Sequence, residues 1–400
     1  MPPRVGLNLL TDEAFLGAVR PLFAEGLVAA LEWDIDDAWG FASRTPPAWA
    51  ERMLDLYAQE GALYGHGVWL SVLTAPWQPR QEVWLERLAQ ECRRRPYRHV
   101  SEHFGFTAAG PFTRSTMLPL PYCGAAVDLG RDRVERLRAA TGGPVGLEVL
   151  ANTLSPVDAV DQGPFLDAVL APSGGFLVLD VHNVWTQAVN TGLPPELLLE
   201  SYPLERVREL HVSGGSWARA LGTADSRPVR LDSHDGPLLP PVLSLLRRAL
   251  ALCPRCELVI VERRGETLQS EDVREEWRAH YRAVVELVAE ARAPLPSPVR
   301  VSSGSSAALR SPPPALLDEA SLARYQRELV TALVEESDSR VILSRLRRGD
   351  AGALLAPYLD TFDSRMVELL AVLASRWSSF DPEQDVFPGS CVPPTGAGSA

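Results

Sequence analysis

Short runs of apolar residues recur along the first 265 residues of this 400-residue chain, and the segments between them are mostly helix-like. Eight of these runs have the length and composition of β-strands. They lie at residues 5–10, 30–36, 64–70, 99–104, 145–150, 175–184, 207–214 and 257–265. Strand–helix alternation repeated eight times predicts an α/β fold, the (β/α)8 TIM barrel, in which chemistry is concentrated where the strands end.

The pattern changes after residue 292. Residues 293–314 are rich in Pro and Ser and carry no periodic apolar pattern, which indicates an interdomain linker between a barrel over residues 1–292 and a second unit. Apolar residues at helical spacing then predict a small α-helical domain over residues 315–380. The last segment, residues 381–400, is rich in Pro and Gly and is expected to be disordered.

Bulk properties narrow the class of partner. The net charge is −12, and no stripe of Lys and Arg is interleaved with aromatic residues, so nucleic acid is a poor candidate partner. The longest apolar stretches are interrupted and only as long as strands, so we expect no membrane span. The chain starts without the long apolar segment of a signal peptide, and its five cysteines suggest no disulfide framework. A reducing cytoplasm is the expected location.

Metal-ligand types of side chain gather at the predicted strand ends. Mixed imidazole and carboxylate ligands suit iron, manganese or zinc, and there are more of them than one ion needs. Two or three ions in one cavity is the simplest interpretation. The residues are His66, His103, Glu148, Asp180, His182, His211 and Glu262, with Asp232 and His234 in the loop after the seventh run.

Packing offers an alternative for some of these residues. A single histidine near a strand end is about as often a hydrogen-bonded structural residue as a ligand. Glu148 and Glu262 point more strongly to a site, because a lone charge at the end of an apolar strand is costly to bury. Arg263 or Arg264 could compensate Glu262 in place of a metal. Strand alternation predicts that Asp180 and His182 face the same way, and that Ser101 and His103 face inward with Glu102 opposite. Further candidates for ligands, or for groups that support them, are His182, Asn152, Asn183 and Glu102.

Nine short motifs, taken in order, resemble the multinuclear non-heme iron-dependent oxidase family, which includes a barrel of methanobactin biosynthesis. The resemblance covers residues 5–290. The motifs are HG at 66–67, SEH at 101–103, LPLPY at 118–122, LE at 147–148, LDVHNVW at 179–185, NTG at 190–192, ELHVSG at 209–214, DSHDGP at 232–237 and VER at 261–263.

The resemblance implies a barrel like that of xylose isomerase, two or three irons, and dioxygen as co-substrate. Such proteins modify ribosomally made peptides, often at cysteine, and many act with a small partner protein. Carried over position by position, the resemblance implies that the iron ligands are His66, His103, Glu148, Asp180, His211, Asp232, His234 and Glu262. The C-terminal helices, with the segment LARYQRELVTALVEE, resemble modules fused to some family members and could take the partner's place.

This chain departs from the family pattern at several points. The family commonly has LDVNN where this chain has LDVHN, so His182 is an added potential ligand, and Arg264 replaces an acidic residue. The first strand end, GLNLLTDEAF, lacks a histidine, and the second, LEWDIDDAW, lacks an EN-type motif. We therefore expect an intact metal site and an atypical substrate pocket near the first, second and eighth strands.

Three functions remain open at this point. The favoured one is an iron- and dioxygen-dependent oxidase that modifies a peptide side chain. The first alternative is a divalent-metal sugar isomerase or epimerase on the same barrel, which needs a base that moves protons and little redox chemistry. The second is a non-catalytic peptide-binding maturation protein, which would have an incomplete ligand set.

Overall fold

The computed structural model describes residues 2–36, 39, 46–109, 117–219, 228–291 and 318–377. In this part of the chain eight parallel strands close into a barrel, in the order β1-β10-β7-β6-β5-β4-β3-β2. The strands are β1 (Arg4–Asn8), β2 (Ala30–Asp34), β3 (Leu63–Gly67), β4 (Val100–His103), β5 (Val145–Glu148), β6 (Phe176–Asp180), β7 (Val207–Val212) and β10 (Leu258–Val261). Strand β1 pairs with both β2 and β10, which closes the barrel. The predicted (β/α)8 barrel is confirmed.

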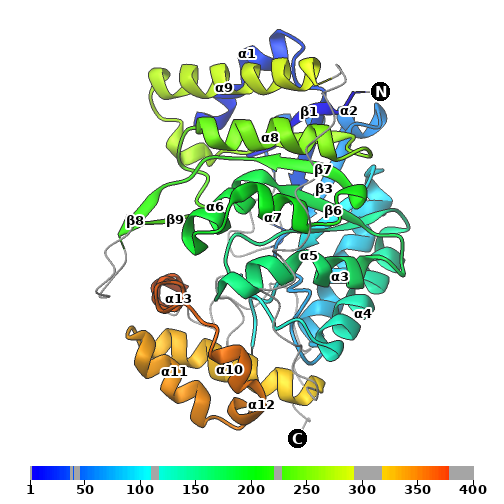
Figure 1. Cartoon of the computed structure of the whole chain (residues 1–400). Helices are drawn as coiled ribbons and strands as arrows, with labels where there is room; N and C mark the ends of the chain where they lie inside the picture. The colour runs from blue at the N-terminus through cyan, green and yellow to red at the C-terminus, as the bar shows by residue number, and fades with distance from the viewer. Residues whose placement is uncertain are drawn as a thin grey trace, which may run out of the picture.

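Helices surround the strands (Figure 1). They are α1 (Glu13–Ala24), α2 (Ala48–Gln59), α3 (Pro79–Arg94), α4 (Gly124–Thr141), α5 (Pro156–Leu170), α6 (Val181–Thr191), α7 (Pro195–Ser201), α8 (Pro240–Leu252) and α9 (Glu271–Glu290). An antiparallel hairpin, β8 (Trp217–Arg219) with β9 (Pro228–Arg230), is inserted between β7 and α8. None of the described helices is long and apolar enough to cross a bilayer.

The barrel interior holds an apolar cluster at its amino-terminal end, beside the buried pair His99 and Glu209, and metal-ligand types of side chain at its carboxyl-terminal end. Ala30, Tyr64, Leu258 and Ile260 form a buried cluster of their own, separate from the main core between strands and helices. Alternate residues of a strand face the same side. The alternation that places Tyr64 inside therefore also brings in His66, which follows it by two positions. Glu262 follows Ile260 in the same way.

The sixth predicted strand is shorter than expected, and this changes the place of His182. The sequence pattern predicts strand through residue 184, but β6 ends at Asp180 and α6 begins at Val181. The Asp180 carboxylate accepts hydrogen bonds from the backbone N–H groups of His182 at 2.6 Å and Asn183 at 3.1 Å. Aspartate is a favoured helix N-cap for this reason. The expectation that Asp180 and His182 face the same way as strand residues was wrong, because His182 is in the first turn of a helix.

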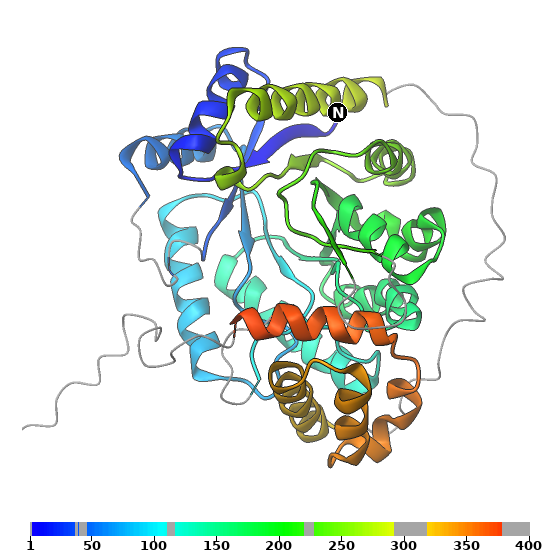
Figure 2. The same cartoon turned by 90° about the vertical axis from the view of Figure 1, so that its left-hand side faces the viewer.

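Four further helices follow the barrel: α10 (Glu319–Glu335), α11 (Ser339–Arg348), α12 (Gly352–Leu359) and α13 (Ser364–Trp377). They fall within the range predicted for the helical domain, whereas the predicted linker at 293–314 and tail at 381–400 lie outside the described residues. Figures 1 and 2 show the four helices together on one side of the barrel.

The C-terminal helices contact the loops at the carboxyl-terminal end of the barrel. The side chain of Gln326 donates to the Leu73 carbonyl at 2.6 Å and accepts from the Ala75 N–H at 2.9 Å. The backbone N–H of Asp363 donates to the Leu154 carbonyl at 2.8 Å. Buried side chains of these helices belong to the same apolar cluster as the barrel core. The module is therefore joined to the barrel by backbone-directed hydrogen bonds as well as by apolar packing.

Candidate metal centre

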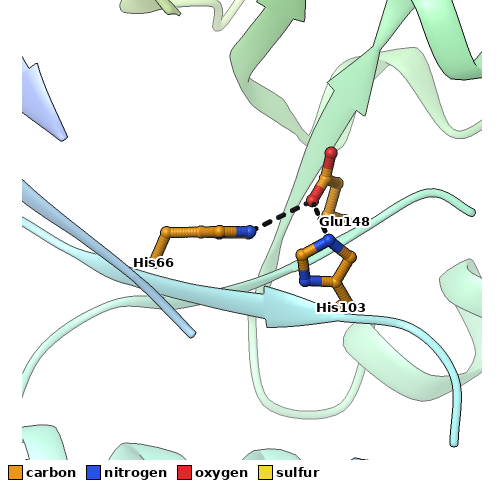
Figure 3. Close-up of side chains that lie close together, drawn as sticks. All are labelled: His66, His103 and Glu148. Carbon is orange, nitrogen blue, oxygen red and sulfur yellow. Dashed lines mark ion pairs between the residues drawn. The ribbon is translucent and has the colours of Figure 1, made fainter. Parts of the chain in front are cut away.

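Three side chains from neighbouring strands converge at the mouth of the barrel. His66, His103 and Glu148 lie at the ends of β3, β4 and β5 and point toward one another (Figure 3). Nε2 of His66 lies 3.2 Å from Oε2 of Glu148, and Nε2 of His103 lies 3.1 Å from the same oxygen. One ligand atom from each residue lies within 4.8 Å of the others, which is a separation that a single ion can bridge.

The surroundings of the two imidazoles determine which nitrogen faces this cluster. Nδ1 of His66 lies 2.8 Å from the hydroxyl oxygen of Ser101, whose O–H donates to the Gly65 carbonyl at 3.4 Å. The Ser101 oxygen therefore accepts from Nδ1–H of His66. Nδ1 of His103 lies 3.1 Å from the Gly67 carbonyl and must also donate. Both rings are held by Nδ1, so a ligand would meet them at Nε2.

A second cluster shares Glu148 with the first. Oε1 of Glu148 lies 3.5 Å from Nδ1 of His211, and Oε1 of Glu262 lies 3.4 Å from the same nitrogen. Asp180 completes a group with Glu148 and His211 whose ligand atoms lie within 4.8 Å of one another. Each of the two Glu148 oxygens thus faces a different histidine set.

A third cluster consists of Asp180, His234 and Glu262, again with ligand atoms within 4.8 Å. Nε2 of His234 lies 2.8 Å from Oδ1 of Asp232 and 3.8 Å from Oε2 of Glu262. His234 has a φ of 51°, a left-handed conformation that is uncommon for residues other than glycine and concentrates at functional sites. Its carbonyl accepts from the Arg264 N–H at 2.8 Å, which helps to hold that conformation.

Unpaired atoms in these clusters test whether a cation fits. Oδ2 of Asp180, Nδ1 of His211 and Oε2 of Glu262 are buried and have no hydrogen-bond partner among the described residues. A buried polar atom without a partner costs about 1–3 kcal/mol. Burial, together with neighbouring carboxylates, raises the pKa of Asp180 to about 6 and that of Glu262 to about 8. A divalent cation would pair these atoms and offset their mutual repulsion, so the residues fit a metal centre.

The pKa values of the histidines also show that the site favours positive charge. Burial disfavours the imidazolium form of His66, but Glu32 and Glu148 outweigh burial and raise its pKa to about 10. Burial is likewise outweighed at His211, where Glu32, Glu262 and Glu148 raise the pKa well above its ordinary value. Burial prevails at His103 and lowers its pKa. Protons on His66 and His211 thus take the position of a cation, and a metal ion would displace them.

Two carboxylates of the site were missed by the sequence analysis. Glu32 forms a ligand-type group with His211 and Glu262, and its Oε2 lies 3.3 Å from Nε2 of His211. Glu209 lies beneath them, with Oε1 3.3 Å from Nε2 of His211 and Oε2 2.7 Å from Nε2 of His99. Each lies inside its strand, whereas Glu148 ends one, so the strand-end pattern did not single them out.

Five candidates lie outside the ligand clusters that the described residues form; they are Asp232, His182, Asn152, Asn183 and Glu102. The Asn152 and Asn183 amides donate to backbone carbonyls at 3.3 and 3.1 Å. Glu102 faces away from Ser101 and His103, as strand alternation predicts, and accepts from the Leu70 N–H at 2.7 Å. Asn152, Asn183 and Glu102 thus support backbone around the site, whereas His182 contacts other side chains.

The clusters open into a cavity of about 1000 Å³. His66, His103, Glu148, Asp232, His234 and Glu262 line its floor, and the walls include Asn8, Leu10, Thr11, Asp12, Asp34, Arg263, Arg264 and Glu266. Asn8 and Asp34 are the last residues of β1 and β2, and the other wall residues belong to the segments after β1 and β10. The same segments depart from the family pattern in the sequence.

A family model described as "RiPP precursor modification enzyme MbnB/TglH/ChrH" matches residues 43–284, more than half of the chain. This chain belongs to that family. The family resemblance predicted from the motifs is confirmed. RiPP denotes a ribosomally made peptide that enzymes then modify.

Curated relatives of this chain are described as UPF0276 proteins. A UPF0276 protein of Rhizorhabdus wittichii is 31% identical over 186 residues, which are 46% of this chain and 63% of that protein. A UPF0276 protein of Acinetobacter baylyi is 27% identical over 252 residues, which are 62% of this chain and 80% of that protein. The chain spans slightly less than two thirds of the first two relatives, at 63% and 64% of their length.

Solved structures resemble this chain at low sequence identity. A xylose isomerase-like TIM barrel protein from Mycobacterium smegmatis has a TM-score of 0.44 and 17% identity, covering 73% of this chain and 98% of that one. Endonuclease IV from Thermus thermophilus has a TM-score of 0.43 and 18% identity, covering 71% of this chain and 99% of that one. These values support no inference about function.

Proposed function

We propose that this chain is an iron- and dioxygen-dependent oxidase that holds two or three irons and modifies a side chain, cysteine in particular, of a ribosomally made precursor peptide. Membership of the RiPP precursor modification family supports the substrate class. Mixed imidazole and carboxylate ligands are compatible with iron, and the choice of iron over manganese or zinc follows from the family resemblance. Dioxygen and the product within natural-product biosynthesis follow from the resemblance set out above.

The observation that carries the proposal is the shared carboxylate of Glu148. Its Oε2 faces His66 and His103, and its Oε1 faces His211. A bridging carboxylate between two histidine sets is the arrangement expected of a multinuclear centre. His66, His103 and Glu148 would hold one ion, and Glu148, Asp180, His211 and Glu262 a second. His234 and Asp232, with Asp180 and Glu262, would hold a third.

Exposure indicates the side from which a substrate would approach. The side chains of His66, Glu148 and His211 are at most 4% exposed, whereas those of His103 and His234 are 23% and 29% exposed. The exposed pair faces the cavity. The buried members would bind and orient the metal, while the side next to His103 and His234 admits the peptide side chain. Bound iron would supply the redox chemistry with dioxygen, and the protein supplies ligands and a site with restricted water access.

We further propose that the C-terminal helices take the place of a separate small partner protein. Their hydrogen bonds to the loops at Leu73, Ala75 and Leu154 support this, because those loops border the mouth of the barrel. The acidic net charge of −12 favours a neutral or basic precursor peptide over a polyanion.

Anaerobic loading with ferrous iron, followed by elemental analysis, tests the metal centre. Wild type should bind more than one iron per chain, His103→Ala should lose one, and Glu148→Ala should lose two because it serves two clusters. His280→Ala is the matched control, since His280 lies on α9 outside these clusters and should leave the iron content unchanged. One iron or none in the wild type would refute the multinuclear proposal.

Incubation of the ferrous protein with Cys-containing precursor peptides encoded by neighbouring genes tests the reaction. A mass change that needs both dioxygen and iron is expected. Equal turnover under argon, or turnover of a sugar with manganese alone, would point to the isomerase or epimerase. Tight peptide binding with no conversion and no iron would point to a non-catalytic maturation protein.

A further inference from the structure

His182 lies between a buried arginine and a candidate ligand. It is fully buried in the first turn of α6. Its Nε2 lies 3.3 Å from both Nε and Nη2 of Arg230. On the other side of the ring, its Nδ1 lies 3.4 Å from Oδ1 of Asp232. The imidazole therefore connects Arg230 to the loop that carries Asp232 and His234.

The chemistry of arginine fixes the tautomer of this ring. A guanidinium group has only donors, so Nε2 of His182 must accept from Arg230. The neutral imidazole then carries its proton on Nδ1, the nitrogen nearest Asp232. One nitrogen is engaged by Arg230 and the other holds hydrogen, so neither has a lone pair free for a metal ion.

Arg230 is itself held in place. It is 2% exposed, and its guanidinium lies 5.0 Å from the Trp185 ring and 5.4 Å from the Trp217 ring. Cation–π contacts of this kind are stronger when the cation is desolvated. Its backbone N–H donates to the Asn190 side chain at 2.7 Å, and the Asn190 amide donates to its carbonyl at 2.9 Å. The arginine is therefore fixed by its backbone and by its side chain.

We propose that His182 is a positioning residue, which holds Asp232 beside His234, and that it is not a metal ligand. The inference rests on the proposed metal centre but adds a role that the ligand clusters do not assign. Asp232 lies on a loop, and its side chain is 25% exposed, so without a partner it would sample several rotamers. The Nδ1–H of His182 lies 3.4 Å from Oδ1 without the alignment of a hydrogen bond, so it favours by electrostatic attraction the rotamer in which this oxygen lies 2.8 Å from Nε2 of His234. Arg230 acts one step further away, by keeping the proton of His182 on Nδ1.

Binding of ferrous iron or cobalt(II) to the full chain under argon tests the role. His182→Ala should weaken binding of one ion by about 10–100-fold, as loss of a group that orients a ligand typically does, and should change the cobalt absorption spectrum of that ion alone. His182→Asn should recover binding to within a few-fold, because its amide can present an N–H to Asp232 in place of the ring. Circular dichroism and thermal melting check that each variant folds.

Arg230→Met separates positioning from ligation. A positioning His182 loses its fixed tautomer in this variant, so binding of the same ion should weaken. A ligating His182 would gain a free Nε2, so binding should tighten or an extra ion should appear, and that result would overturn the inference. Wild-type affinity and spectrum in His182→Ala would overturn it too. If the wild type binds no ferrous iron, the proposed metal centre is wrong and this inference fails with it. If the wild type binds iron normally and the variants bind it equally well, only the role of His182 is wrong.

Discussion

Nδ1 of His66 lies 2.8 Å from the hydroxyl oxygen of Ser101, one strand away on β4. That hydroxyl donates to a backbone carbonyl, so its oxygen can only accept from the ring. A serine that carries no metal-binding function of its own thus determines which nitrogen of His66 faces Glu148.

Ser101→Ala should lower the affinity of the first ligand cluster for ferrous iron by about tenfold or more, because His66 can then rotate or change tautomer. Equilibrium dialysis under argon measures the affinity. Ser101→Thr keeps the hydroxyl and should bind like the wild type. Equal affinity for the alanine and threonine variants would show that packing alone orients His66.

Glu209 should matter for stability more than for metal content. Its carboxylate is fully buried between His99 and His211. Removing one partner of a buried charged pair costs about 3–5 kcal/mol, since the other is left uncompensated. Urea unfolding of metal-free Glu209→Ala should show a loss of that size. Glu257→Ala is the control, because Glu257 is partly exposed and its loss should change stability by about 1 kcal/mol or less. Comparable losses in the two variants would contradict the argument.

Asp158 on α5 predicts a pH dependence of stability. Burial is the main cause that raises its pKa to about 7, from an ordinary value of 3.8. The folded protein therefore binds this proton more tightly than the unfolded chain does. The contribution of this protonated carboxyl to the free energy of unfolding is present in full below about pH 4. It declines as the pH rises to about 7 and is lost above that.

Asp158→Asn should remove this decline, which amounts to about 2–4 kcal/mol in the free energy of unfolding. Urea unfolding of variant and wild type between pH 4 and 8 would give the difference directly. Asp128→Asn is the matched control, since the Asp128 side chain is 78% exposed. A wild-type-minus-variant difference that does not change with pH would show that the Asp158 carboxyl is not protonated in the fold.

The contact between α13 and the inserted hairpin predicts that a C-terminal substitution affects the metal centre. Met366 and Leu369 pack with Val229 in a separate buried cluster. Val229 lies two residues before Leu231, where the loop that carries Asp232 begins. Met366→Ala should destabilise by about 2–4 kcal/mol and weaken binding at the His234 cluster, while the His66 cluster binds normally. Val341→Ala is the control, because Val341 is 42% exposed on α11. Metal titration of both variants measures the effect, and loss at both clusters would indicate general unfolding instead.

Strand ends were predictable because two independent signals coincide there. An apolar run that stops on a charged residue, as in VGLE at Glu148, implies both a strand and a compensated charge. Glu32 is also a buried charge, but it lies inside its strand and does not mark a strand end. Its role became visible only when closure of the barrel placed it beside His211.

His182 shows why local pattern was insufficient. His182 lies two positions after Asp180, which fits strand alternation, but Asp180 caps a helix, so His182 lies in a helix and not in a strand.

The C-terminal helices show another limit. Their periodicity identifies which face of each helix is buried, but nothing in it specifies that Val229 covers Met366, because that contact joins segments far apart in the chain.

Glu148 gives the centre a property that its separate clusters lack. With one oxygen directed to each histidine set, the carboxylate has a single orientation that suits both. An ion that arrives at either cluster therefore fixes this side chain for the other and has already met the entropic cost of ordering it. Two ions bound in this way would load cooperatively, so a sample supplied with too little iron would contain filled and empty molecules in preference to half-filled ones.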